Sequence, residues 1–309
     1  MSHTHQAGVE SFCISSALIF AALVYLRGLI RLRAYDRDSV WRAGSLVFGL
    51  LLIWIATASP LATLDHELLT AHMVQHLLLM TLAPPLILLG APAKALAQGM
   101  SRRFVQKIGR SFCSAPLQRL GRALQHPVVC WLGAAGTLVV WHIPSVFMLG
   151  LHSQVWHGIE QASFLVTGLL FWWPVVRLET ESSAWPESSI LLYLFLATLP
   201  CDILSGFLVF CDRMVYPVYQ ASSPSFGMSA LEDQQCAGAL MWTCVTVVYL
   251  IAGGVCTARL LSPRWFEEGP ILRFESKPAA IAPAAPHKIE VGGMPAAGVS
   301  VAGFDSPAP

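Results

Sequence analysis

Seven apolar segments, each long enough to cross a lipid bilayer, constrain this chain more than any other feature of its sequence. They lie near residues 12–31, 41–58, 68–90, 127–148, 157–176, 190–210 and 236–259. An α-helix rises about 1.5 Å per residue, so about 20 apolar residues cross the roughly 30 Å of hydrocarbon. Charged residues make up only 12% of the chain, against about 25% in soluble domains. The sequence therefore predicts an all-α fold, a polytopic membrane bundle of seven transmembrane helices.

The basic residues predict how this bundle is oriented. Cytoplasmic loops of membrane proteins carry an excess of Lys and Arg over the loops on the other side. Here 18 of the 19 basic residues lie on one side of the seven predicted helices, and only Arg213 lies on the other. This asymmetry places the N-terminus outside and the C-terminus in the cytoplasm. No basic residue precedes the first apolar segment, unlike in a secretory signal, so we expect that segment to be a retained helix.

Three regions follow from this topology. Residues 1–11 form an external N-terminal segment, residues 12–265 form the membrane domain, and residues 266–309 form a cytoplasmic tail. The tail is rich in Pro, Ala and Gly, a composition that cannot build a core, so we expect it to be disordered. The net charge of +1 gives no indication of a nucleic-acid partner.

The cytoplasmic loop 94–124 has a pattern of its own. Apolar residues recur in it every four positions: Leu96, Met100, Phe104, Ile108 and Phe112. Basic residues such as Arg103 and Lys107 lie between them. This pattern is typical of an amphipathic helix in the membrane interface, so we expect the loop to contact membrane lipid.

Ionisable side chains occur within the apolar segments, and the predicted topology gathers them in the outer half of the membrane. His72 and His76 lie one helical turn apart in the third segment, so they share one helix face. The other side chains lie in, or at the start of, the four segments that follow: His142, His157, Glu160, Asp202 and Asp233. Taken singly, such a residue is more often an interhelical hydrogen-bonding group. A cluster of ionisable groups inside a membrane, however, indicates a functional site.

The residue types in this cluster favour a metal site. Imidazole nitrogen suits copper, zinc and iron, and thioether and thiolate sulfur prefer Cu(I). We predict a metal site, with copper as the first choice, whose ligands come from seven residues: His72, His76, His142, His157, Glu160, Asp202 and Asp233. Sulfur-bearing residues such as Met73, Met80 and Cys201 lie in the same half of the membrane, and we interpret the methionines as packing residues.

Two consecutive prolines, Pro84 and Pro85, lie in the inner half of the third segment. Proline lacks an N–H, so the carbonyls of Met80 and Thr81 lose their helical partners and the helix is expected to kink. We interpret this kink as a packing feature that lies below the histidine cluster.

Several motifs occur in order along the chain: His-Met-Val-Gln-His-Leu-Leu-Leu from His72, Ala-Pro-Pro-Leu-Ile-Leu-Leu-Gly-Ala-Pro from Ala83, Trp-His-Ile-Pro from Trp141, the segment His157–Pro174, and Glu-Asp-Gln-Gln from Glu232. Together they resemble the CtaG-like family of cytochrome c oxidase assembly factors, the multispan type first associated with caa-type oxidases. The likeness runs from about residue 40 to residue 259.

This resemblance implies a multi-pass protein of the bacterial inner membrane that is needed to assemble haem–copper cytochrome c oxidase. It implies that the protein supplies or retains copper, with an oxidase subunit or another assembly factor as its partner. The residues of this chain that match the family's motifs position by position are His72, His76, His142, His157, Glu160, Asp233, Gln234 and Gln235. Asp202 matches more loosely.

Two alternatives from other functional classes stay open. The first is a haem-binding membrane redox protein, with iron held between histidines on facing helices such as His76 and His142. The second is a scaffold without a cofactor, in which the histidines hydrogen-bond the helices together. We do not expect an enzyme, because no nucleophile with a base and an orienting acid occurs at a recognisable spacing, and there is no phosphate-binding glycine loop.

Overall fold

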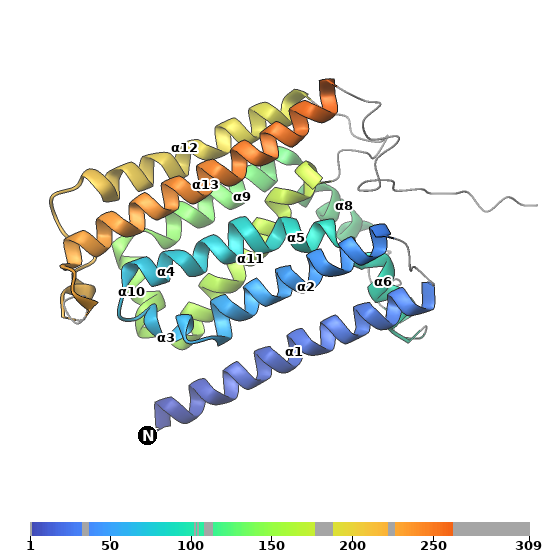
Figure 1. Ribbon diagram of the computed structural model, residues 1–309, viewed down its shortest axis with the longest axis horizontal. Helices are drawn as coiled ribbons and strands as arrows, with labels where there is room; N and C mark the ends of the chain where they lie inside the picture. The colour runs from blue at the N-terminus through green and yellow to red at the C-terminus, as the bar shows by residue number, and fades with distance from the viewer. Residues whose placement is uncertain are drawn as a thin grey trace, which may run out of the picture. The chain divides into compact units, whose positions relative to one another are not determined.

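The computed structural model of the chain (Figure 1) describes residues 2–32, 37–101, 103, 105–107, 114–176, 188–221 and 226–261. Within these ranges the chain is helical and has no strand, which confirms the predicted all-α fold. The predicted cytoplasmic tail, 266–309, lies outside the described residues. The elements are α1 (Ser2–Leu32), α2 (Arg37–Ala58), α3 (Leu61–Leu64), α4 (Leu69–His76), the π-helix η1 (Leu77–Leu82), α5 (Ala83–Leu89), α6 (Pro92–Gly99), α8 (Ala115–Leu124), α9 (Pro127–Trp141), α10 (Pro144–His152), α11 (Gln154–Val176), α12 (Ser188–Phe210), the 3-10 helix η2 (Pro217–Gln220) and α13 (Ala230–Leu261).

Six helices of the described part of the chain are long and apolar enough to cross a membrane. They are α1, α2 with its continuation through α3, the run from α4 to α5, α11, α12 and α13. A seventh candidate is the pair α8 and α9, which are bent by 71° relative to each other. The predicted seven spans are therefore reached when this bent pair is counted as one span. α1 begins at Ser2, and its candidate span begins at Ser11, next to the predicted start near residue 12.

The fourth apolar segment, predicted as one helix over 127–148, is broken. α9 ends at Trp141, and α10 begins at Pro144. The residue before a proline avoids the helical conformation, and Ile143 is indeed extended, with φ −66° and ψ 126°. His142 is therefore the C-terminal cap of α9 and not a residue within a continuous helix.

The third apolar segment lies at the centre of the bundle. It packs against α2, α11 and α13, and Figure 1 shows α4 and α5 between α2 and α13. Of the most apolar 18 residues in the run from α4 to α5, 56% are buried. The corresponding share is 33% or less in the other five single-helix spans. The histidines of this segment are thus surrounded by protein.

The double proline produces a π-helix. In η1 the N–H of Ala83 bonds to the carbonyl of Leu78, five residues back. The carbonyl of Met80 has no helical partner, because both Pro84 and Pro85 lack an N–H. It accepts the indole N–H of Trp172 instead, at 3.2 Å. The run from α4 to α5 is long and apolar enough to cross a membrane as one span, and the Met80 carbonyl that the prolines leave free is paired to another helix.

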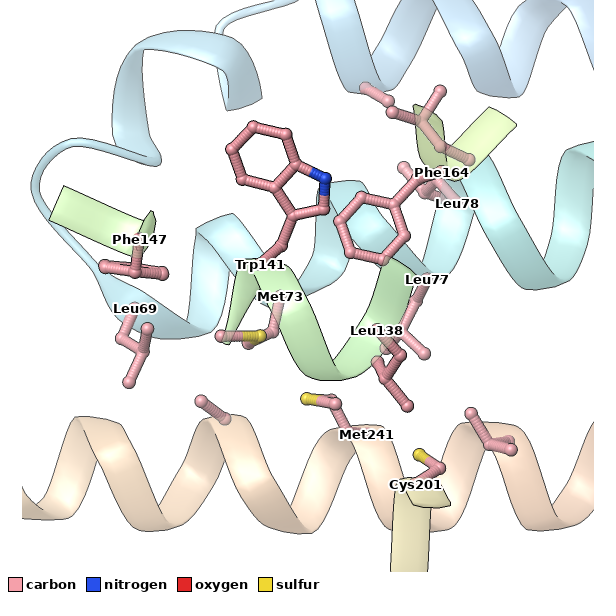
Figure 2. Packing of buried hydrophobic residues seen from close by; sticks show 14 of the residues in the cluster. Leu69, Met73, Leu77, Leu78, Leu138, Trp141, Phe147, Phe164, Cys201 and Met241 are labelled. Carbon is pink, nitrogen blue, oxygen red and sulfur yellow. The ribbon is translucent and has the colours of Figure 1, made fainter. Parts of the chain in front are cut away.

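The main apolar cluster surrounds this central segment. Figure 2 shows its labelled side chains, which come from α4, η1, α9, α10, α11, α12 and α13: Leu69, Met73, Leu77, Leu78, Leu138, Trp141, Phe147, Phe164, Cys201 and Met241. Many large apolar side chains on the outside of the bundle are exposed, for example Phe20, Ile203 and Leu250. An apolar exterior is what a lipid environment requires, and it supports a multi-pass membrane protein.

The predicted amphipathic loop is not one helix in its first part. α6 ends at Gly99, and Met100 is extended with ψ 167°. Parts of the four-residue repeat, including positions 104, 108 and 112, lie outside the described residues. α6 packs against α1, and the backbones approach so closely at Gly28 and Gly99 that neither glycine has room for a Cβ.

Candidate metal centre

Two helices bring four of the predicted ligands together. His72 and His76 lie four residues apart on α4, and His157 and Glu160 lie three residues apart at the start of α11. Each spacing places its pair on one helix face. The two helices are in contact, and the side chains of the two pairs meet between them.

Glu160 is at the centre of this group. Its Oε1 lies 3.4 Å from His72 Nε2 and 3.4 Å from His76 Nε2, and its Oε2 lies 3.3 Å from His157 Nδ1. Glu160 and His72 are fully buried, and His76 is 5% exposed. One buried carboxylate is therefore surrounded by three imidazole rings.

A second carboxylate extends the group toward the loop between α3 and α4. Asp65, at the C-terminal cap of α3, is fully buried, and its Oδ2 lies 3.0 Å from His157 Nε2. Burial raises the pKa of Asp65, but the hydrogen bond and charge of His157, together with His66 and His72, outweigh burial, so the pKa is lowered. His157 thus connects two carboxylates through its two ring nitrogens. The sequence prediction missed Asp65 because it considered ionisable groups within apolar segments; the adjacent His66 was the available signal.

The donor atoms are spaced as metal ligands are. Both oxygens of Glu160 and both nitrogens of His72 are buried without a hydrogen-bond partner, although buried polar atoms are normally paired. The separations of 3.3–3.4 Å exceed the roughly 2.7–2.9 Å of a charge-assisted hydrogen bond. Two ligands that each lie about 2.0 Å from a tetrahedral ion are about 3.3 Å apart. The residues present therefore fit a metal ion.

Among the described residues, two groups of three ligands meet the distance requirement for a metal. One is His72, His76 and Glu160, and the other is Asp65, His72 and His157; within each group the ligand atoms lie within 4.8 Å of one another. We call them the inner triad and the outer triad. They share His72, so the two possible ion positions are adjacent.

Asp233, a predicted ligand, has a different place. Its carboxylate accepts the backbone N–H groups of Leu69, at 2.7 Å, and Thr70, at 3.0 Å. These are the first two residues of α4, whose N–H groups lack partners within the helix. A carboxylate at this end also compensates the helix dipole. Asp233, on α13, therefore holds the helix that carries His72 and His76.

His142 and Asp202 are not part of either triad. His142 lies beside His76, with ring centroids 5.9 Å apart. Its Nδ1 is 2.7 Å from the carbonyl of Leu138, and its Nε2 is 3.3 Å from the sulfur of Met73. Asp202, on α12, is partly buried, and its Oδ1 has no hydrogen-bond partner. The structure thus brings together four of the seven predicted ligands.

Neighbouring elements fix the walls of the site. The hydroxyl of Tyr216 donates to the carbonyl of His142, and that of Tyr219 donates to the carbonyl of Asp65, both at 2.8 Å. α10 approaches so closely that a Cβ on Gly150 would lie 2.7 Å from Glu160 Oε2. The carboxylate therefore depends on the absence of a side chain at Gly150.

A small cavity of about 40 Å³ adjoins the site and has His76 in its lining. Other lining residues are Thr81, Trp131, Cys201 and Met241. A single water needs roughly 10–15 Å³ of such volume, whereas pockets that bind small molecules measure roughly 300–1,000 Å³. The cavity therefore has room for a few waters, not for a large organic group.

A family model described as "Cytochrome c oxidase caa3 assembly factor" matches residues 23–262, a range that includes every residue of both triads. No solved structure shows a significant match to the chain.

Two mycobacterial relatives are similar over most of this chain. An uncharacterized protein of Mycobacterium leprae is 21% identical over 253 residues, which cover 77% of this chain and 37% of the relative. An uncharacterized protein of Mycobacterium bovis is 22% identical over 244 residues, covering 74% and 36%. The chain thus spans little more than a third of the length of these curated relatives.

Proposed function

This chain belongs to the cytochrome c oxidase caa3 assembly factor family, and we propose that it serves oxidase assembly by holding copper as cargo at the two triads. The ion is then passed to an oxidase subunit or to another assembly factor. The proposed ligands are His72, His76 and Glu160 for the inner triad, with Asp65 and His157 for the outer triad.

One observation carries this proposal: the inner triad places two imidazoles and a carboxylate within 4.8 Å in a buried position. Burying an ionised carboxylate is costly unless its charge is compensated. A cation compensates the carboxylate and uses the free electron pairs of the imidazoles. Imidazole is a good copper ligand, and copper is a constituent of the oxidases whose assembly gives the family its name.

The shared ligand His72 supports a transfer role. Asp65 lies in the loop between two spans, whereas His76 lies one helical turn deeper than His72 along α4. An ion that leaves the inner triad for the outer triad keeps His72 throughout and moves toward the membrane surface. With the N-terminus outside, as the basic residues predict, this surface is the outer face of the bacterial inner membrane.

The alternatives receive less support from the site. A haem between His76 and His142 needs a large pocket, and the cavity that His76 lines measures about 40 Å³. A scaffold without a cofactor would hold its buried groups at hydrogen-bond distance, yet the three imidazole nitrogens nearest Glu160 lie 3.3–3.4 Å from its oxygens, longer than a charge-assisted hydrogen bond.

The test is copper binding by the purified full chain in detergent, together with oxidase activity in a strain lacking the protein. We expect the wild type to bind copper and restore the oxidase, and His72→Ala to lose both, because His72 belongs to both triads. The matched control is His152→Ala, since His152 is exposed and bonds only to the carbonyl of Met148. Absence of copper from the wild-type protein, with full complementation by His72→Ala, would overturn the proposal.

A further inference from the structure

We infer that His142 and Met73 form a second, softer ligand pair beside the inner triad, and that this pair takes copper as Cu(I). The inference rests on the proposed function, because it names the form of copper that the site accepts. The two residues come from different helices: His142 caps α9, and Met73 follows His72 on α4.

The hydrogen bonding of His142 fixes which of its nitrogens is free. Nδ1 lies 2.7 Å from the carbonyl oxygen of Leu138. A carbonyl only accepts, so Nδ1 carries the proton. In a neutral imidazole the other nitrogen, Nε2, then has a lone pair and no proton. Histidines that bind metals are held in this way, with the second ring N–H donated to a carbonyl or carboxylate.

The free nitrogen of His142 faces sulfur. Nε2 lies 3.3 Å from Sδ of Met73, and Met73 is fully buried. A proton on Nε2 would make the ring a buried cation, which is costly without a carboxylate partner. The ion pairs of the described residues include five between a histidine and a carboxylate, and none involves His142. Two lone pairs therefore face each other in a buried position.

A soft cation satisfies both atoms. With a nitrogen about 2.0 Å and a sulfur about 2.3 Å from an ion, a separation of 3.3 Å corresponds to an angle near 100° at the ion, which leaves room for a third ligand. Thioether sulfur selects Cu(I) over harder ions. Met73 therefore gives this position a preference for Cu(I), which the nitrogen and oxygen ligands of the triads do not provide.

His76 links the soft pair to the inner triad. Its Nε2 lies 3.4 Å from Glu160, its Nδ1 is buried without a hydrogen-bond partner, and its ring centroid lies 5.9 Å from that of His142. The third ligand of Cu(I) is thus available from a residue that also belongs to the triad. Copper held by His142, Met73 and His76 is one ligand exchange away from Glu160.

Packing alone is the competing explanation for Met73, and a matched methionine separates the two. Met241 belongs to the same apolar cluster and is 2% exposed, but no hydrogen bond or ion pair involves it in the described residues. Met→Leu preserves side-chain volume and is well tolerated in cores. Met73→Leu and Met241→Leu therefore perturb packing to a similar extent, and only the first removes the proposed ligand.

The experiment is anaerobic Cu(I) titration against a competing chelator, with X-ray absorption at the copper edge, on full chain labelled with selenomethionine. We expect copper–selenium scattering in the wild type and in Met241→Leu and its loss in Met73→Leu. We also expect a fall in Cu(I) affinity of at least about tenfold in Met73→Leu, with Zn(II) affinity at the triads unchanged. The labelled wild type gives the selenium signal without any substitution, so the result does not depend on the folding of a variant.

The outcomes separate this inference from the function on which it rests. Wild-type protein that binds Cu(I) without copper–selenium scattering, or Met73→Leu with unchanged Cu(I) affinity, overturns the soft pair and leaves the triads as the copper site. Wild-type protein that binds no copper in either oxidation state overturns the proposed function itself, and the soft pair with it.

Discussion

A single carboxylate dominates the site at the scale of individual residues. Glu160 is fully buried, and three imidazole nitrogens lie 3.3–3.4 Å from its oxygens. An ionised carboxylate in a membrane bundle is costly unless a cation or hydrogen bonds compensate it. The position of Glu160 therefore supports a bound cation more strongly than any one histidine does.

The first prediction concerns the charge of Glu160. Glu160→Gln keeps the shape of the side chain and removes its negative charge, so copper affinity should fall more than about tenfold. Removing one member of a buried charge pair destabilises by roughly 3–5 kcal/mol, so the metal-free variant should also lose thermal stability, because the three histidines around Glu160 remain. Copper titration and thermal unfolding in detergent measure the two effects. Glu67→Gln, at an exposed carboxylate near the site, is the control, and equal affinities in the two variants would contradict the role of Glu160.

The second prediction concerns the space beside that carboxylate. Gly150→Ala would place a Cβ 2.7 Å from Glu160 Oε2, so the carboxylate must move. We expect copper affinity to fall by roughly tenfold or more, as it does when groups that orient a ligand are altered. Gly158→Ala lies on the same helix as Glu160 and meets no atom within 4 Å, so it should bind copper as the wild type does. The same titration shows whether the two glycines differ.

Helical spacing made part of the site predictable from the sequence. His72 with His76, and His157 with Glu160, share a face by spacing alone, and the structure places these four together. Asp65 was missed because it lies outside the apolar segments. The contacts of Asp233 with α4 were also unpredictable, since an acidic residue at the start of one helix gives no sign that it caps another.

At the scale of elements, the run α4–η1–α5 is held at its N-terminus and near its middle by other helices. Its N-terminus receives the carboxylate of Asp233 from α13, and the carbonyl of Met80 in its π-helix receives the indole of Trp172 from α11. The two histidines of α4 lie between these two contacts. Their positions therefore depend on helices that supply no ligand as well as on those that do.

The third prediction concerns the cap of α4. Asp233→Ala leaves the N–H groups of Leu69 and Thr70 without their acceptor, at a cost of roughly 1–3 kcal/mol in the free energy of unfolding. Copper affinity should fall as well, because the same helix carries His72 and His76. Thermal unfolding and metal titration measure both. Asp212→Ala, at an exposed aspartate, should leave both unchanged; equal stability of the two variants would contradict the cap.

The fourth prediction concerns the π-helix. Trp172→Phe removes the N–H that satisfies the Met80 carbonyl, so we expect a loss of roughly 1–3 kcal/mol in stability. Trp156 lies on the same helix and is 42% exposed, so Trp156→Phe is the matched control. Denaturation curves of the two variants should separate; if they coincide, the indole contact contributes nothing to holding η1.

The elements were predictable where hydropathy decides them. Length and apolar character identified the helices, but a six-residue π-helix in a uniformly apolar run leaves no periodicity of its own in the sequence, so η1 was not foreseen. The break at His142 had a visible cause in Pro144, yet the apolar run across it favoured one long helix. Both departures lie next to candidate ligands, and π-helical segments are frequent at functional sites.

At the scale of the whole molecule, the exterior is apolar, and a few ionisable side chains are buried within the apolar core. Large apolar side chains such as Phe12 and Phe210 are exposed, whereas Asp65, His72 and Glu160 are fully buried.

The chain spans 36–37% of its mycobacterial relatives, so the match concerns this membrane unit and not the rest of those proteins.

The fifth prediction concerns orientation. If the basic residues set the topology, the C-terminus is cytoplasmic and the loop after α12 is outside. Green fluorescent protein fused to the C-terminus should fluoresce, and alkaline phosphatase fused after Asp212 should be active in whole cells. The reverse fusions, phosphatase at the C-terminus and fluorescent protein after Asp212, should be inactive. An active C-terminal phosphatase would invert the topology and place the triads near the inner face.

The line of side chains from His66 to Glu160 has a consequence for charge balance. The side chain of His66 is 52% exposed and lies 3.8 Å from Asp65, which lies 3.0 Å from His157, which lies 3.3 Å from Glu160. Metal ions displace protons from their ligands when they bind. These four groups form a line of ionisable side chains from solvent to the buried carboxylate. An imidazole of the site that loses a proton when an ion binds therefore has proton acceptors on its solvent side, so loading and emptying the site need not leave net charge inside the membrane.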